Sequence, residues 1–147
     1  MESDLTIRPA ERRDLDEIHA IERASFPAPW RREFFESELN APGRFTLVAT
    51  RGRKVAGYIF AMWVFDEMHI NKIAVVAGER RKGIAQALMD RCFTFAREHA
   101  VETISLEVRQ SNIGAQEFYR QLNFESVYIR PRYYPDNEAA VVMTRKM

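Results

Sequence analysis

Four segments of the chain carry the spacing of apolar residues that is typical of helices. The clearest covers residues 83–99, where apolar side chains recur along one stripe at Ile84, Leu88, Cys92 and Phe95. This stripe predicts an amphipathic helix about 25 Å long. Shorter helices are expected over residues 13–26, 31–40 and 112–122, and prolines within the segment FPAPW separate the first two.

Seven other segments are rich in β-branched and aromatic residues, which predicts strands. They cover residues 4–9, 44–50, 55–65, 67–76, 101–109, 124–130 and 139–145. The long predicted helix lies between the strands 67–76 and 101–109, and this strand–helix–strand order makes the two strands parallel. We therefore predict a mixed α/β fold.

The composition is that of an ordinary single domain. The chain has 147 residues without a repeat or a linker, so residues 1–147 are expected to fold as one unit. A formal net charge of +1 argues against a nucleic-acid partner, because phosphate binding needs a clustered positive excess. No apolar run is long enough to span a membrane, the charged N-terminal segment does not resemble a secretory signal, and Cys92 is the only cysteine. These features favour a cytoplasmic protein.

The segment AGERRKG, residues 77–83, joins a predicted strand to the long predicted helix. Free amide groups at a helix N-terminus bind anions, and Arg80, Arg81 and Lys82 add positive charge there. Gly83 has no Cβ atom that would keep a phosphate away from the backbone. The segment therefore suggests a diphosphate site, although a turn with solvated cations remains an alternative. It matches neither the P-loop pattern nor the dinucleotide pattern GxGxxG.

The string RRKGIA, residues 80–85, resembles the Q/R-x-x-G-x-G/A signature of the GCN5-related N-acetyltransferases (GNAT). FPAPW, FDEMHINKIAV, ISLEVRQSN, EFYRQLNF and RPRYYP resemble segments of the RimI type, the ribosomal-protein-alanine N-acetyltransferases. The resemblance covers nearly the whole chain. It implies the GNAT fold, with a mostly antiparallel seven-stranded sheet, one parallel strand pair around the cofactor, and about four flanking helices.

The resemblance also implies an activity and assigns roles to residues. Acetyl-CoA would donate its acetyl group directly to the N-terminal alanine α-amine of a small-subunit ribosomal protein or a similar protein, and no metal would be needed. Glu107 would be the general base, and Tyr119 would stabilise or protonate the leaving thiolate. The residues that would bind acetyl-CoA are Ile73, Ala74, Val75, Arg80, Arg81, Lys82, Gly83, Ile84, Ala85 and Asn112. The aromatic residues Trp30, Tyr133 and Tyr134 would line the peptide groove.

Considered without the resemblance, these residues have ordinary alternative roles. Glu107 alternates with the apolar Leu106 and Val108, so it could be a solvated charge on the outer face of a strand. Tyr119 could be an amphipathic residue at a helix edge, and Asn112 could cap a helix. His19, His69 and His99 lack the spacing of metal ligands.

The choice of acceptor has two alternatives. An α-amine with a pKa of about 7.7–8.0 is partly neutral at physiological pH, whereas a lysine amine with a pKa near 10.4 is almost fully charged. This difference favours a protein N-terminus over a lysine. A small-amine or polyamine acetyltransferase and a non-catalytic acyl-CoA sensor are the alternative functions. The protein is expected to be a monomer or a weak homodimer.

Overall fold

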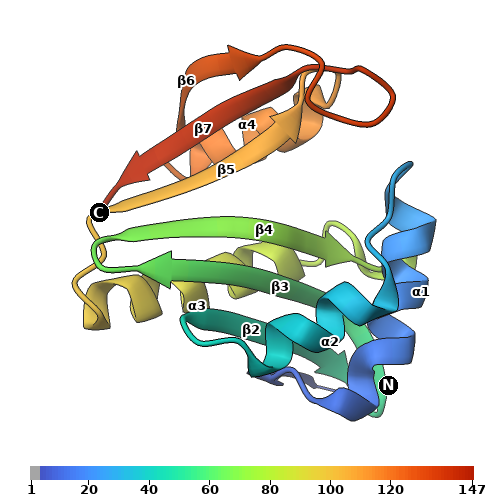
Figure 1. Cartoon of the computed structure of the whole chain (residues 1–147). Coiled ribbons are helices and arrows are strands. Elements are labelled where there is room, and N and C mark those ends of the chain that lie inside the picture. Colours follow the sequence, from blue (N-terminus) through green and yellow to red (C-terminus); the bar gives the residue numbers. More distant parts are fainter. Residues whose placement is uncertain (1–3) are drawn as a thin grey trace.

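The computed structural model describes residues 4–147, which form a seven-stranded sheet with helices on both faces (Figure 1). The strand order is β1-β2-β3-β4-β5-β7-β6. The strands are β1 (Leu5–Pro9), β2 (Arg44–Arg51), β3 (Lys54–Val64), β4 (Glu67–Val75), β5 (Thr103–Arg109), β6 (Glu125–Arg130) and β7 (Ala140–Lys146). The helices are α1 (Leu15–Ser25), α2 (Arg32–Asn40), α3 (Ile84–Glu98) and α4 (Ile113–Gln121), with short 3-10 turns at Arg12–Asp14 and Ala77–Glu79. The predicted mixed fold is confirmed.

Strands β4 and β5 form the parallel pair that the sequence predicts, and all other neighbouring strands are antiparallel. The parallel pairing is short: it joins Glu67 to Thr103, Met68 to Ile104 and His69 to Ser105. Beyond these three pairs the two strands diverge, as the right-hand side of Figure 1 shows. The sheet therefore has an opening between the second half of β4 and the second half of β5.

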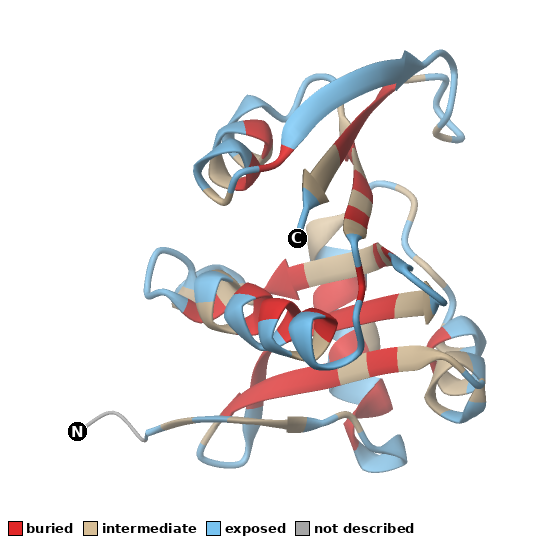
Figure 2. Cartoon of the chain, turned by 90° about the vertical axis from the view of Figure 1, so that its left-hand side faces the viewer, coloured by how far each residue is buried: buried red, intermediate tan, exposed pale blue. Residues whose placement is uncertain are grey.

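Two hydrophobic cores lie on opposite faces of the sheet. Helices α1 and α2 cover one face, where Leu15, Ile18 and Phe35 pack against Tyr58 and Phe60. Helix α3 covers the other face with Ile84, Leu88 and Cys92, three residues of the stripe predicted from the sequence, and α4 joins this core through Tyr119. Figure 2 shows, in red, that buried positions lie along the strands and on the inward sides of the helices. Side chains along β4 and β5 therefore point alternately to two faces of the sheet. We call the face covered by α1 and α2 the α1/α2 face, and the face covered by α3 and α4 the α3/α4 face.

A β-bulge interrupts the alternation in β4. Phe60 of β3 pairs with Lys72, whereas the next residue, Ala61, pairs with Ile70, so Asn71 is an extra residue on β4. An extra residue shifts the phase of the side chains that follow it. His69 and Lys72, three positions apart, consequently share the α1/α2 face, where a regular strand would place them on opposite faces.

Gly57 of β3 allows the start of α3 to pack closely on the sheet. A Cβ atom at this position would lie 2.8 Å from the carbonyl oxygen of Ala74 and 3.3 Å from Cγ2 of Ile84. A side chain there would push apart β4 and the first residue of α3. Within residues 4–147, none of these helices is long and apolar enough to cross a membrane.

Candidate active site

His69 and Glu107 meet where β4 and β5 begin to diverge. The Nε2 atom of His69 lies 2.5 Å from Oε2 of Glu107, and its Nδ1 atom lies 2.7 Å from Oδ1 of Asn71. Ser105 is the last β5 residue that pairs with β4, and Glu107 lies two residues after it. The side chain of Glu107 is only 12% exposed. The bulge residue Asn71 thus orients the imidazole that contacts the carboxylate.

The contact between His69 and Glu107 changes the proton affinity of both groups. Burial alone would lower the pKa of His69, but the hydrogen bond and charge of Glu107, with the hydrogen bond to Asn71, raise it above its ordinary value. Burial alone would raise the pKa of Glu107, but the hydrogen bond and charge of His69 lower it. Both imidazole nitrogens face oxygen acceptors, so the protonated ring is favoured. The pair therefore consists of an ionised carboxylate and a histidine that keeps its proton to higher pH than usual.

Tyr119 of α4 lies on the other face of β5 from Glu107. It lies in the α3/α4 core with Leu106 and Val108, the two neighbours of Glu107 along the strand. Burial, with a smaller effect from Tyr134, raises the pKa of Tyr119 above its ordinary value, so the phenol stays protonated. Its hydroxyl group makes no hydrogen bond to any other residue within 4–147. The two predicted catalytic side chains therefore belong to opposite faces of the same strand.

The basic segment between β4 and α3 has the geometry of an anion site. Gly83 is the N-cap residue of α3 and adopts a left-handed backbone conformation with φ of +83°. Residues other than glycine rarely adopt this conformation. No side chain within the described residues 4–147 caps this helix, so the first amide groups of α3, at Ile84 and Ala85, have no side-chain acceptor there. Apart from its two chain neighbours, no residue within 4–147 has an atom within 4 Å of the position of a Cβ atom on Gly83. Glycine is therefore required at this position by the backbone conformation and not by close contacts with other residues.

The three cations of this segment differ in their contacts. The Nε atom of Arg80 donates to the carbonyl oxygen of Val75 at 3.2 Å, which ties the loop to the end of β4. Lys82 lies 4.0 Å from Glu79, and Glu79 also pairs with Arg51. Arg81 is exposed and has φ of +63°. Exposed positive charge and uncapped amides fit the pyrophosphate of acetyl-CoA, so the residues present are suited to the predicted ligand.

The main chain of Ile73, Ala74 and Val75 forms one edge of the opening. On its other side β4 pairs with β3, joining Ile73 to Ile59 and Val75 to Gly57. On the side facing β5, strand pairing within residues 4–147 ends at His69. Main-chain groups on this edge therefore lack a strand partner within residues 4–147, and their contact with the cofactor stays a prediction.

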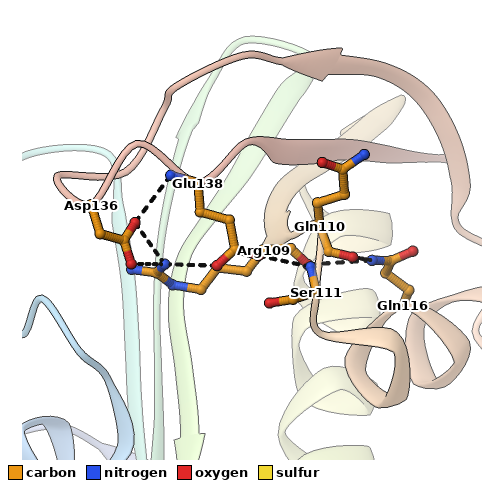
Figure 3. A network of polar contacts seen from close by, with 6 residues as sticks. All are labelled: Arg109, Gln110, Ser111, Gln116, Asp136 and Glu138. Carbon is orange, nitrogen blue, oxygen red and sulfur yellow. Dashed lines mark hydrogen bonds and ion pairs between the residues drawn. The ribbon is translucent and has the colours of Figure 1, made fainter.

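A polar network holds the end of β5 to the loop that precedes β7 (Figure 3). Arg109 donates to Asp136 at 2.8 Å and to Glu138 at 2.9 Å, and the other carboxylate oxygen of Glu138 accepts from the main chain of Ser111 at 2.8 Å. Gln116 of α4 donates to the carbonyl oxygen of Gln110 at 2.9 Å. The network fixes the position of the β6–β7 loop relative to the strand that carries Glu107.

Asn112 has the capping role considered from the sequence. Its side-chain oxygen accepts a hydrogen bond of 3.1 Å from the main chain of Ala115 at the start of α4. The amide nitrogen of the same side chain makes no hydrogen bond within residues 4–147. A contact with the cofactor stays a prediction.

The three aromatic residues predicted to bind substrate occupy two segments. Tyr133 and Tyr134 lie in the β6–β7 loop with ring centroids 5.1 Å apart, and the guanidinium of Arg109 stacks on Tyr134 at 4.1 Å. Burial and then the charge of Glu107 raise the pKa of Tyr133, so this ring lies near the carboxylate. Trp30 follows α1 and packs against Phe35 with ring centroids 5.2 Å apart. The two segments come from opposite sides of the opening.

Sequence reasoning missed two features of this site. His69 was grouped with scattered histidines, although it contacts Glu107, because the register of the parallel strands was not known. Glu22 and Lys72, which pair at 2.9 Å beside Trp30, were not singled out either. Two signals in the sequence could have indicated this pair. Glu22 interrupts the apolar stripe of the first predicted helix, and Lys72 is a charged residue inside a predicted strand. No group of three or more His, Cys, Asp or Glu side chains within 4–147 has the arrangement of a metal site.

Comparison with known proteins identifies the family. Residues 15–124 match the Acetyltransferase (GNAT) family. The chain is 34% identical over 157 aligned positions to an N-alpha-acetyltransferase of Saccharolobus solfataricus, covering 98% of this chain and 94% of the relative. The crystal structure of the ribosomal-protein-S18-alanine N-acetyltransferase from Escherichia coli superimposes with a TM-score of 0.90 at 31% identity, covering 97% and 94% of the two chains. Arabidopsis thaliana NAA60, solved in complex with acetyl-CoA, shares the fold with a TM-score of 0.90 at 19% identity over 98% and 99% of the chains. The chain therefore belongs to the GNAT family and is an acetyl-CoA-dependent N-acetyltransferase.

Proposed function

We propose that this enzyme acetylates the N-terminal α-amine of a protein, with a ribosomal protein that begins with alanine as the natural substrate. The observation that carries the proposal is the His69–Glu107 pair at the opening between β4 and β5. The pair places an ionised carboxylate beside the opening on the α1/α2 face. The uncapped N-terminus of α3 follows the end of β4. An amine and a thioester could thus meet in the opening from different sides.

The acceptor amine would bind at Glu107. An α-amine with a pKa of about 7.7–8.0 is neutral in a useful fraction of molecules at physiological pH, so it needs no strong base before it attacks. The nitrogen becomes far more acidic once it bonds to the carbonyl carbon, so even a carboxylate with a lowered pKa can take its proton. The low pKa of Glu107 is therefore compatible with a role as base towards an α-amine, and less suited to the almost fully protonated amine of lysine.

Acetyl-CoA, when bound, supplies a thioester whose carbonyl carbon accepts the amine while its sulfur departs as a thiolate. A nitrogen–carbon bond forms and the carbon–sulfur bond breaks, so no covalent bond to the enzyme is required. Glu107 receives the amine proton. Tyr119, whose raised pKa keeps its phenol protonated, donates a hydrogen bond that stabilises the leaving thiolate. Main-chain amides on the open edge of β4, within Ile73–Val75, stabilise the negative charge that develops on the carbonyl oxygen.

The loop before α3 would hold the pyrophosphate. Free amides at Ile84 and Ala85 would bind the phosphate oxygens, and Arg81 and Lys82 would balance their charge. Asn112, at the start of α4, would contact the cofactor from the C-terminal half of the sheet. These contacts would span the opening between the two halves.

The class of acceptor is supported by the relatives and by the site. The Saccharolobus protein is an N-alpha-acetyltransferase, and the Escherichia coli protein acts on ribosomal protein S18 at an alanine. Trp30 and the tyrosine pair Tyr133 and Tyr134 approach the opening from two sides, which suits an extended peptide better than a compact amine. The same residues would line the peptide groove.

A competition assay tests this proposal. The enzyme is offered acetyl-CoA with three acceptors: a peptide that begins with alanine, the same peptide with a blocked N-terminus and an internal lysine, and a polyamine. Mass spectrometry then locates the acetyl group. We expect acetylation of the free α-amine at a much higher kcat/KM than for the other two acceptors. Preferred transfer to the polyamine or to the lysine, or binding of acetyl-CoA without turnover of any acceptor, would overturn the proposal.

A further inference from the structure

A buried ionic cluster connects α1 to β4 beside the opening. The side chain of Glu22 on α1 is fully buried. One carboxylate oxygen accepts a hydrogen bond of 2.6 Å from the hydroxyl group of Tyr58. The other accepts from the main chain of Trp30 at 2.9 Å and lies 2.9 Å from Nζ of Lys72. A carboxylate is buried at low cost only when such donors satisfy it, so the cluster fixes Trp30 and Lys72 relative to each other.

Lys72 extends from β4 into an aromatic corner. Its Nζ atom lies 4.0 Å from the centroid of the Phe26 ring and 5.5 Å from that of Trp30. The faces of aromatic rings stabilise a cation but do not replace its hydrogen bonds to water. An ammonium group has three N–H donors, and Glu22 is the one acceptor that Lys72 contacts within residues 4–147. At least one donor is therefore left for a ligand, and the side chain keeps 15% of its surface exposed.

The bulge at Asn71 turns this ammonium group towards the face that carries the catalytic pair. Asn71 orients His69, which contacts Glu107, and Lys72 is the next residue along the strand. The Cα atoms of His69 and Lys72 are separated by at most about 10 Å. A peptide whose amine binds at Glu107 would extend over this same face, where its first carbonyl oxygen can approach the side chain of Lys72. The side chain of Trp30 bounds the same corner.

We propose that Lys72 is a specificity-determining residue that donates a hydrogen bond to the carbonyl oxygen of the acceptor's first residue. This inference rests on the proposed function and adds a reason for the choice of acceptor. Every protein N-terminus carries this carbonyl group next to its amine, whereas a polyamine has methylene groups and a second cation instead. A fixed ammonium group attracts the carbonyl oxygen and repels the second cation. Lys72 therefore selects peptides over aliphatic amines.

A thioamide substrate tests the contact directly. We compare a peptide that begins with alanine with the same peptide in which sulfur, a weaker acceptor, replaces its first carbonyl oxygen. Wild-type enzyme should acetylate the thioamide with a kcat/KM about tenfold lower, because a hydrogen bond to a charged donor is weakened. Lys72→Met keeps the length of the side chain but removes the donor. This variant should treat the two peptides alike, and Lys72→Arg should restore part of the difference.

A second variant guards against a purely structural effect. Lys72→Met leaves Glu22 with two donors and an unbalanced charge, so the double variant Lys72→Met/Glu22→Gln is made as well. The double variant should also acetylate the ordinary peptide and its thioamide form with similar kcat/KM. Its KM for acetyl-CoA should stay within about twofold of the wild-type value. Its kcat/KM ratio of polyamine to peptide should rise. An equal thioamide penalty in wild type and in both variants would overturn the role of Lys72. If wild-type enzyme acetylates no peptide at its α-amine, the proposed function itself is overturned.

Discussion

Nε2 of His69 lies 2.5 Å from Oε2 of Glu107, and this contact joins the last paired residue of β4 to a β5 residue two positions beyond the last pair. It crosses the point where the sheet opens, so it is a structural link as well as a candidate catalytic pair. Asn71, the extra residue of the bulge, holds the other nitrogen of the ring. A bulge in β4 thus determines the orientation of the group that controls Glu107.

Glu107→Gln should lower kcat by a factor of about 100 or more, because an amide cannot accept the proton of the amine. The dissociation constant of acetyl-CoA should change little, since the residues proposed to bind it lie elsewhere. Steady-state kinetics with an N-terminal alanine peptide and calorimetry with acetyl-CoA measure the two effects. Glu102→Gln is the matched control, because Glu102 is exposed and precedes the same strand. Equal kcat values for Glu107→Gln and the control would remove Glu107 from catalysis.

The His69–Glu107 pair should stabilise the fold mainly in mildly acidic solution. The pKa of Glu107 is lowered from 4.5, so its contribution is present above that value and is lost as the pH falls through the folded-state pKa. The pKa of His69 is raised from 6.5, so its contribution is fully present below that value and is lost as the pH rises through the folded-state pKa. Both contributions are complete between pH 4.5 and 6.5.

The variant His69→Gln tests this pH dependence. Urea unfolding of wild type and variant at a series of pH values gives the difference in their free energies of unfolding. We expect the difference to be greatest between pH 4.5 and 6.5 and to shrink towards pH 9 and towards pH 3. A difference that does not vary with pH would show that the two groups do not share a proton.

Tyr119→Phe should slow acetyl transfer by about one to two orders of magnitude while leaving the unfolding free energy nearly unchanged. No buried side-chain oxygen within residues 4–147 lacks a partner, so the unbonded hydroxyl group of Tyr119 reaches solvent and its removal leaves no buried group unsatisfied. Tyr58→Phe is an instructive contrast. The hydroxyl group of Tyr58 donates to the buried Glu22, and its loss should destabilise the fold by about 1–3 kcal/mol. Single-turnover kinetics and urea unfolding of both variants separate the two roles.

Gly83→Ala should weaken acetyl-CoA binding and cost about 1 kcal/mol of stability, because φ of +83° is unfavourable for alanine. Gly78→Ala is the matched control in the same segment. Gly78 has no positive φ, and a Cβ atom there would contact nothing within 4 Å. Calorimetry with acetyl-CoA and urea unfolding measure both effects. Similar affinities for the two variants would argue against a pyrophosphate site at the start of α3.

Regular periodicity explains why the elements could be predicted from the sequence. The stripe from Ile84 to Phe95 predicts a helix over 83–99, and the structure has α3 at Ile84–Glu98. Leu106 and Val108 are buried and alternate with Glu107, as the strand pattern predicts. Both features depend on local spacing and on burial, which a sequence displays directly. The parallel relation of β4 and β5 followed from the helix between them.

The side-chain pairs at the site depend on features that have no local signal. His69 meets Glu107, 38 residues away, only because Met68 pairs with Ile104 and not with its neighbours. Lys72 shares a face with His69 only because Asn71 is an extra residue, and simple alternation would separate them. Register and bulges arise from tertiary packing, so motif resemblance could point to Glu107 and Tyr119 but not to their partners.

The position of Cys92 has a practical consequence for measuring turnover. This only cysteine of the chain is completely buried in the α3 core, and burial raises the pKa of its thiol to about 12. Thiolate, the form that attacks disulfide dyes and alkylating reagents, is therefore scarce and shielded in the native protein. A colorimetric thiol reagent should thus report each molecule of coenzyme A released, without a background signal from the folded enzyme. Any additional colour would reveal molecules that have unfolded.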